Sequence, residues 1–438
     1  MKTSKLLKLF MAVLVAGTIT GCSTIGGFFG DDDDDQERLP GERYTVLELE
    51  EELEPDPVLE ANQISIPEAW NNQYWPQYAG YPNHAMGHVG LGQNLKNVWN
   101  AKIGEGGTDT RPLYMPPIVA DNVVFTMDTN LKISAVDANS GNVFWARKLP
   151  VKENRAESAL GGGLAYHAGR IYATSGLTKL FVLNPQNGQV VQTIDLPAPA
   201  RAAPSVLDGK IYVQMLNNSL NVYSAEDFKL VWAYDGFAET TSLLGATAPA
   251  VDKDVVVAAF SSGEIVALQN QNGQTLWTDS LASVKAASAL ASIADIKGAV
   301  VLDKGLAYAL SYNGRMIATD IASGRRVWQR NLGGTQTPWA SGNVVYVVTG
   351  DRELVALSRV DGRIHWVTPL GGRTWYGPVL AGGRLIAVEA GGQMVEYDAK
   401  TGKVLRSTEL KSAPASAPVV SGNRLFVLLQ NGTLAAYR

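Results

Sequence analysis

Cysteine is nearly absent from this chain of 438 residues, because Cys22 is the only one. A single cysteine excludes intramolecular disulfides, Cys-x-x-Cys redox sites, iron–sulfur clusters and cysteine-rich zinc sites. The sequence also lacks a Gly-x-Ser-x-Gly elbow and a P-loop, which are signs of serine hydrolases and of nucleotide phosphate sites. These absences favour a binding scaffold over an enzyme, with no catalytic residue and no cofactor.

Histidine is scarce as well, with four residues. His84 and His88 have the spacing of two metal ligands on a helix. Pro82, Gly87 and Gly90 argue against a helix there, and no third ligand is near in the sequence. We therefore interpret both as loop histidines and expect no metal site.

Charged residues are also few. Charged residues make up 18% of the chain, and the net charge is −5. An acidic protein of this kind is not expected to bind the phosphates of nucleic acids. By contrast, 46% of the residues are hydrophobic and 44 are glycine, which indicates a large core built from short strands and tight turns.

Residues 1–21 are predicted to be a lipoprotein signal peptide. Three lysines precede the apolar run 9–15, which is too short to span a bilayer. Residues 19–22 resemble a bacterial lipobox, which implies that Cys22 is acylated, with palmitate-type chains, as the mature N-terminus. Two or more acyl chains make such an anchor stable. Ser23 implies sorting to the inner leaflet of the outer membrane; the alternative is an ordinary signal peptide with an incidental cysteine.

Residues 22–68 are predicted to be an acidic flexible tether. They include five consecutive aspartates at 31–35 and the acidic stretch 47–54. A solvated, self-repelling linker fits this run better than a calcium site, because no turn glycine or spaced ligands accompany it. Residues 69–96 are rich in Trp and Tyr, so we expect them to pack on the folded body that follows.

A repeat fills residues 97–438. Its phrase is a turn, a glycine, three residues and then usually a tryptophan. The clear copies are Gly141 to Trp145, Gly273 to Trp277, Gly324 to Trp328 and Gly362 to Trp366. Degenerate copies place Gln192 and Arg406 in the Trp position, whereas Trp232 keeps the ring without the glycine, and Trp99 stands alone upstream. These eight positions lie about 38 to 51 residues apart, which is the period of a propeller blade.

Two further strand signals precede each phrase, so each unit predicts four antiparallel strands. The last unit stops after three strands, and the strand around Trp99 has no partners before it. Pairing the two would close the ring and remove two sheet edges. The predicted fold is therefore all-β: an eight-bladed β-propeller with four-stranded antiparallel blades, in which an N-terminal strand pairs with the C-terminal three strands.

The repeat resembles that of the PQQ-enzyme-like β-propeller family, in which tryptophan docks one blade onto the next. That resemblance gives a structural, blade-docking role to six residues: Trp99, Trp145, Trp232, Trp277, Trp328 and Trp366. With the lipobox and eight units, the chain is similar to the BamB-like outer-membrane assembly lipoproteins. The resemblance implies a non-catalytic scaffold on the periplasmic face of the outer membrane. It would dock on a BamA-like assembly channel and assist the insertion of β-barrel proteins.

The same resemblance points to two neighbouring inter-blade segments as the partner-binding site. Leu243 and Asp295 match the apolar and acidic positions of the family. Leu244 stands where the family has an arginine, and Lys297 stands where it has an acid, which weakens the transfer. An alternative is that the two leucines only cap a blade.

Two other functions stay open. One is a lipid-anchored dehydrogenase with PQQ and Ca²⁺, and the other is a periplasmic propeller that binds peptides or glycans. The repeat is specific for the fold and much less so for the function.

Overall fold

The structure is a computed structural model that describes residues 53–59, 63–152, 160–237, 247–282, 295–312 and 314–438. The predicted signal peptide, Cys22 and the five aspartates lie outside the described residues. Where the chain is described it forms β-strands, and none of its segments is a helix long and apolar enough to cross a bilayer.

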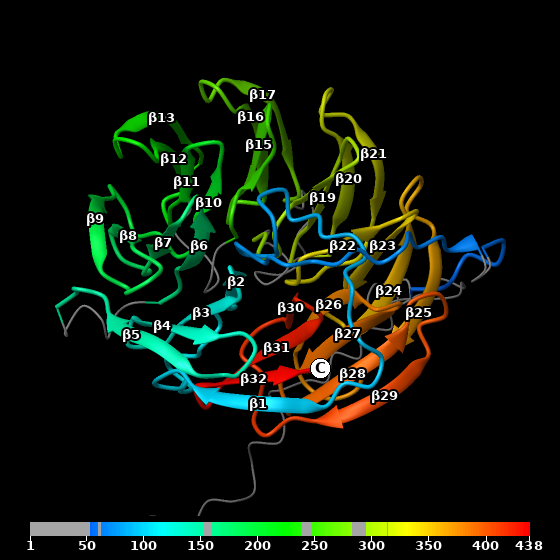
Figure 1. Ribbon diagram of the computed structural model, residues 1–438. Helices are drawn as coiled ribbons and strands as arrows, with labels where there is room; N and C mark the ends of the chain where they lie inside the picture. Colours follow the sequence, from blue (N-terminus) through cyan, green and yellow to red (C-terminus); the bar gives the residue numbers. More distant parts are fainter. Residues whose placement is uncertain (1–52, 60–62, 153–159, 238–246, 283–294, 313) are drawn as a thin grey trace, which may run out of the picture. The chain divides into compact units, whose positions relative to one another are not determined.

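The strands form eight four-stranded antiparallel sheets arranged around a ring (Figure 1). The fold class predicted from the repeat is confirmed. From the centre outward, the sheets of the first four blades are β2(Ile118–Ala120), β3(Val123–Met127), β4(Lys132–Asp137), β5(Val143–Lys148); β6(Gly163–His167), β7(Arg170–Thr174), β8(Lys179–Leu183), β9(Val190–Asp195); β10(Ser205–Leu207), β11(Lys210–Gln214), β12(Ser219–Ser224), β13(Leu230–Asp235); β14(Ala250–Val251), β15(Val255–Ala259), β16(Glu264–Gln269), β17(Thr275–Ser280).

The remaining four blades continue around the ring in the same way. They are β18(Val301–Asp303), β19(Leu306–Leu310), β20(Met316–Asp320), β21(Arg326–Arg330); β22(Trp339–Ser341), β23(Val344–Val348), β24(Glu353–Ser358), β25(Ile364–Pro369); β26(Trp375–Ala381), β27(Arg384–Glu389), β28(Gln393–Asp398), β29(Val404–Glu409); β30(Val419–Ser421), β31(Arg424–Leu429), β32(Thr433–Tyr437), β1(Asn97–Lys102).

The ring closes where the two ends of the repeat region meet. β1 pairs antiparallel with β32, with Trp99 opposite Ala436 and Lys102 opposite Thr433. The eighth blade is therefore built from both ends of the propeller sequence. This pairing removes the two edges that an open ring would expose.

Burial follows the position of a strand in its blade. The second and third strands are buried on both faces, because a neighbouring blade covers each face of the sheet. Such strands are apolar without alternation, as in Val255–Ala259. The outermost strands are largely exposed, as in Val143–Lys148.

The six tryptophans of the repeat lie at the junctions between blades. Each indole packs on the glycine of the next blade: Trp99 on Gly141, Trp145 on Gly188, Trp232 on Gly273, Trp277 on Gly324, Trp328 on Gly362 and Trp366 on Gly402. A Cβ on Gly324 would lie 2.5 Å from Cγ of Trp277, and Gly324 has a φ of +70°. A side chain at this position is therefore excluded by both the ring and the backbone.

The indole N–H groups add hydrogen bonds at the same junctions. In five of the six cases Nε1 donates to the carbonyl three residues before the glycine, on Ala138, Pro185, Asn270, Ile321 and Arg359. Each of these tryptophans thus fixes the next blade by ring packing and by one polar contact.

The degenerate copies have compensating partners. Gln192 replaces tryptophan in the second blade, and the next blade carries Phe228, instead of glycine, with a φ of +62°. Phe228 packs against the cluster shared by these two blades, with the Arg170 guanidinium 5.4 Å from its ring centroid. The aromatic ring is therefore supplied from the opposite side of the junction.

Arg406 occupies the last position, at the seventh blade. The eighth blade has no turn before its outer strand, because β1 comes from the other end of the sequence. Arg406 instead donates from Nη2 to Oδ1 of Asn94, 2.8 Å away. An arginine reaches a polar partner here, where there is no glycine for a ring to cover.

The packed part of the chain begins earlier than the tether boundary drawn at residue 68. Asp56 N donates to Ile364 O on β25, and Ile64 is buried in the main hydrophobic cluster. Ser65 N also donates a hydrogen bond to Oδ1 of Asn343. The sequence did not predict these contacts, because the apolar residues of this acidic segment are isolated and follow no strand or helix pattern.

We expect Trp277→Ala to lower the free energy of unfolding by about 3–5 kcal/mol, because it removes a buried ring and the hydrogen bond to Ile321. Denaturant titration followed by fluorescence and circular dichroism measures this. The control is Phe144→Ala on the exposed outer strand β5, where we expect a change within about 0.5 kcal/mol. Equal losses in both variants would contradict the docking role.

Candidate functional site

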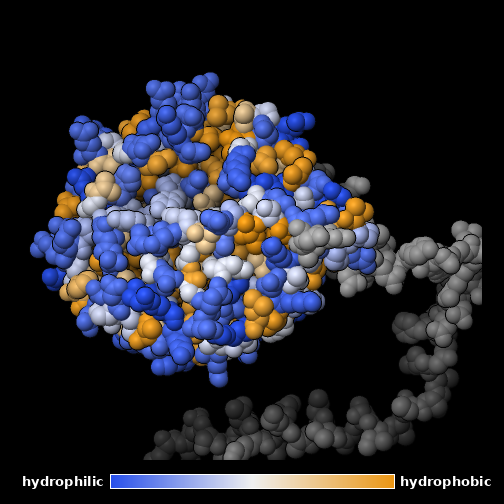
Figure 2. All heavy atoms as spheres, turned by 45° about the vertical axis from the view of Figure 1, so that its right-hand side comes forward, coloured by the Kyte–Doolittle hydropathy of each residue, from blue (hydrophilic) through white to orange (hydrophobic). Residues whose placement is uncertain are grey.

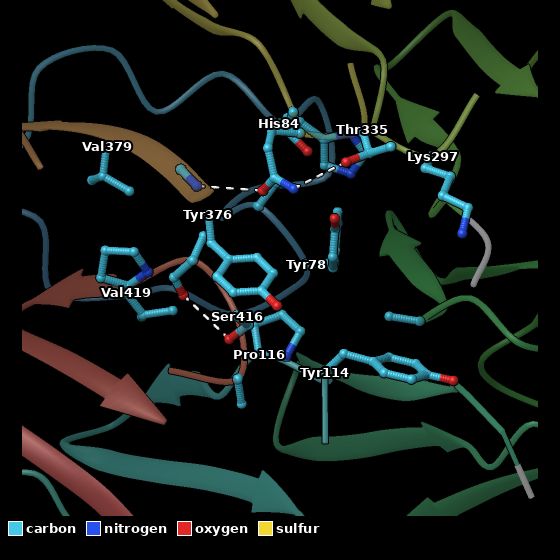
Figure 3. A pocket seen from close by; sticks show the side chains of 18 of the residues that line it. Tyr78, His84, Tyr114, Pro116, Lys297, Thr335, Tyr376, Val379, Ser416 and Val419 are labelled. Carbon is cyan, nitrogen blue, oxygen red and sulfur yellow. Dashed lines mark hydrogen bonds between the residues drawn. The ribbon is translucent and has the colours of Figure 1, made fainter. Parts of the chain in front are cut away.

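The inner ends of the blades surround a central cavity of about 400 Å³. Its wall comes from residues ahead of the inner strands and from part of the N-terminal segment at 75–84. Figure 3 shows Tyr78, Tyr114 and Tyr376 around the open space, with Lys297 at one side. Trp75 and Trp339 also line the cavity, with their rings stacked at 6.1 Å between centroids. Trp and Tyr rings thus form part of the wall, together with prolines and small residues.

The charged side chains of this wall are cationic, although the protein is acidic. Arg201 and Lys297 line the cavity, and none of the described lining residues is an Asp or Glu. Burial lowers the pKa of Lys297, and the nearby Asp295 opposes that shift. Burial raises the pKa of Tyr114, opposed by Arg201. The lining therefore suits anionic and aromatic groups better than cations.

His84 is a titratable group of the wall with a strongly shifted pKa. Its side chain is buried, and Nδ1 lies 2.7 Å from the carbonyl of Val300. Burial lowers the pKa of His84 to about 4, and the hydrogen bond to Val300 only partly opposes this. His84 is therefore neutral near pH 7, with the proton on Nδ1 donated to Val300. His88 is also structural: its Nδ1 faces Pro67 O, and its Nε2 accepts from Gly383 N.

A calcium-bound quinone does not fit this cavity. Calcium takes six to eight oxygen ligands, mainly carboxylates. The described wall offers no carboxylate, and no group of three or more His, Cys, Asp or Glu elsewhere in the described ranges is placed to hold a metal. The donor set thus differs from the one that PQQ-enzyme chemistry requires.

The residues predicted to bind a partner fall in different environments. Leu243 and Leu244 lie outside the described residues. Asp295 is 3% exposed, and its carbonyl accepts a hydrogen bond from Tyr312 N. Lys297 faces the cavity. The structure thus brings Asp295 and Lys297 together in one inter-blade connection, beside the central cavity.

The cavity wall was not foreseen, but the repeat carries a signal for it. Proline directly precedes the inner strand in five blades, at Pro117, Pro204, Pro249, Pro338 and Pro418. Proline has no N–H to donate, so it is tolerated at the start of an edge strand. A recurrent proline ahead of the first strand, present in five of the eight units, marks the edge that faces the channel.

A second candidate surface follows the outer strands. Figure 2 shows hydrophobic side chains in small groups among hydrophilic ones on the face in view. The exposed apolar residues of the outer strands include Val98, Val143, Phe144, Val191, Leu230, Val231, Leu276, Val327, Val404 and Leu405. Outer edges with apolar side chains suit the addition of an extended peptide strand.

Comparison with known proteins bears on what these surfaces do. The sequence profile of the family described as outer membrane protein assembly factor BamB matches residues 129–368 and 366–438. The chain belongs to the BamB family. BamB of Yersinia pestis is 27% identical over 346 residues, covering 78% of this chain and 88% of that protein. BamB of Escherichia coli K12 is 25% identical over 343 residues, covering 77% and 87%.

Solved structures agree on the fold. The crystal structure of BamB from Moraxella catarrhalis matches with a TM-score of 0.69 and 20% identity, covering 79% of this chain and all of that one. The quinohemoprotein alcohol dehydrogenase of Comamonas testosteroni matches with a TM-score of 0.68 and 13% identity, covering 86% and 82%. The propeller is thus shared by BamB proteins and dehydrogenases, and the fold alone does not separate them.

The buried His84 predicts a pH dependence of stability. The unfolded chain takes up a proton near the usual pKa of 6.5, whereas the folded chain resists protonation down to about 4. Stability therefore falls as the pH drops through this window, by roughly 2 kcal/mol between about pH 7.5 and about pH 5.

The matched variant is His84→Asn, since asparagine tolerates the φ of +60° at this position. Urea unfolding at several pH values should show a weaker loss of stability on acidification in this variant. Carboxylates titrate in both proteins, so the difference between them reports His84. Identical pH profiles would contradict a neutral, buried histidine.

Proposed function

We propose that this protein is a non-catalytic scaffold of the machinery that assembles β-barrels in the outer membrane. It docks on a BamA-like channel protein and assists the folding and insertion of barrel proteins. The observation that carries the proposal is membership of the BamB family, with relatives matched over more than three quarters of the chain. The lack of a carboxylate among the described residues of the cavity wall supports a scaffold over a quinone-dependent enzyme.

The docking site in this proposal lies on two adjacent inter-blade connections. Leu243 and Leu244 belong to the connection between β13 and β14, and Asp295 and Lys297 to the one between β17 and β18. Both join an outer strand to the inner strand of the next blade, and the described strand ends that flank them lie at the same end of the ring. Asp295 helps to position the connection, and Lys297 offers a positive charge at its base.

The outer strands supply a second part of the proposed activity. Their free edges and exposed apolar side chains hold extended segments of unfolded barrel proteins by strand addition. β25 illustrates the contact within the chain itself, because Asp56 N donates to Ile364 O at its outer edge.

In the same proposal, acyl chains on Cys22 hold the protein at the periplasmic face of the outer membrane. The lipid anchor is its contact with the membrane, and residues beyond Cys22 connect it to the propeller. The cavity and surfaces of the propeller then face the periplasm.

We expect Cys22→Ser to abolish incorporation of labelled palmitate and to shift the protein from the membrane to the soluble periplasmic fraction, because the acyl chains supply its membrane affinity. Mass spectrometry of the mature N-terminus identifies the acylated cysteine in the unmodified chain. A variant that still fractionates with the membrane without lipid would contradict the anchor.

We expect the double variant Leu243→Asp/Leu244→Asp to recover less channel protein in a crosslinking pull-down, by more than about tenfold, because an interface buries these carboxylates without partners. The matched control is Val404→Asp/Leu405→Asp, an exposed apolar pair on β29. It should recover the channel normally. Full recovery with the Leu243/Leu244 variant would reject this docking site.

A further inference from the structure

The N-terminal segment 70–90, which we call the strap, contacts every blade of the ring in circular order. Figure 1 shows it as the blue segment that runs across the ring. Its contacts, in sequence order, are Asn72 with Val420, Trp75 with Val119, Pro76 with Tyr166, Gln77 with Val206, Pro82 with Val251, Asn83 with Leu302, Gly87 with Trp339 and Val89 with Leu380. These partners lie on β30, β2, β6, β10, β14, β18, β22 and β26, the eight innermost strands.

Most of these contacts are hydrogen bonds to the backbone of the inner strands. Trp75 and Val119 exchange two backbone bonds of 2.8 Å. The amide of Gln77 does the same with Val206, because Nε2 donates to its carbonyl and Oε1 accepts from its N–H. The amides of Val251 and Leu302 donate to the carbonyls of Pro82 and Asn83. The strap thus behaves as an extra strand shared among eight sheets.

The strap also closes on itself. Trp70 N donates to His88 O at 3.0 Å, and Gly90 N donates to Trp70 O at 2.8 Å. Its two ends therefore lie side by side after a full circuit. The chain then continues into β1, which completes the eighth blade.

The inner strands need such a partner for a physical reason. Each has one edge paired within its own sheet and the other facing the channel. Unpaired N–H and C=O groups at such an edge cost free energy when they are withdrawn from water. Apolar anchors accompany the pairing, since Trp75, Met86 and Val89 of the strap are buried.

The strap lies at one end of the channel. Tyr74 Oη donates to Asp121, and Gly422 N donates to the carbonyl of Asn72. Asp121 and Gly422 belong to turns between the first and second strands of their blades. Lys297, which precedes β18, lies at the opposite end, because the turn between the first and second strands follows the inner strand whereas Lys297 comes before it. Trp75, Tyr78 and His84 therefore form a floor to the cavity on the strap side.

We propose that the strap is an intramolecular clasp that couples the eight blades into one cooperative unit and closes one mouth of the central channel. The inner edges of the blades are thus occupied by residues 70–90 of the same chain, which bind there as an extended peptide would. The clasp reserves the inner edges of all blades, so partner strands pair at the outer edges alone. The family profile begins at residue 129, beyond this element.

The first test cuts the chain behind the strap. A protease recognition sequence is inserted between the exposed residues Gln93 and Asn94 of the full chain. After cleavage, we expect the N-terminal fragment to co-elute with the propeller in gel filtration and to separate only on unfolding. A fragment that dissociates while the propeller keeps its thermal midpoint would overturn the proposal, whereas dissociation with loss of the propeller fold would support it.

The second test needs no cut. Gln77→Ala removes both side-chain bonds to Val206, and we expect the Val206 amide to exchange hydrogen about tenfold faster. Coupling predicts that the amides of Val119, Val251 and Leu302 accelerate as well. The matched control is Gln73→Ala, whose side chain bonds Asn71 within the strap. Acceleration confined to Val206 would show independent contacts and overturn the clasp.

Discussion

The packing of one tryptophan ring on the glycine of the next blade is the contact on which the ring depends. It recurs at six of the junctions, and in five of them the indole N–H also bonds the neighbouring turn. Each contact fixes the angle between two sheets, and eight such angles must add up to a full circle. Where tryptophan is missing, Phe228 or Arg406 supplies another contact suited to the local geometry.

Two further sets of contacts, in addition to the blade junctions, close the ring. β1 joins the first and last parts of the propeller sequence through one sheet, and the strap joins all eight sheets at the centre. Both use residues far apart in the sequence, so both pay a loop-closure cost that a repeat protein otherwise avoids. The result is a ring whose inner edges pair with the strap and whose outer edges lie at the circumference, where Asp56 contacts β25.

The central cavity and the outer edges of the blades present different chemistry. The cavity wall contains several Trp and Tyr rings and two cationic side chains, and its described part has no carboxylate to hold a hard cation. The outer circumference carries exposed apolar side chains next to free strand edges. The proposed scaffold function uses this circumference for extended client segments and the channel end that carries Lys297 for docking.

The number of blades, the strand content and the ring closure could all be predicted from local sequence patterns. The reason is that the Gly-to-Trp spacing is local to each unit, and the missing strand of the last unit can be counted. The path of residues 70–90, the cavity wall and the position of Lys297 became known from the three-dimensional structure. These depend on loops such as those holding Tyr114 and Arg201, which differ in length between blades and converge from distant parts of the chain. The closed ring brings their side chains together at the channel, and a local sequence pattern cannot predict contacts between residues so far apart in the chain.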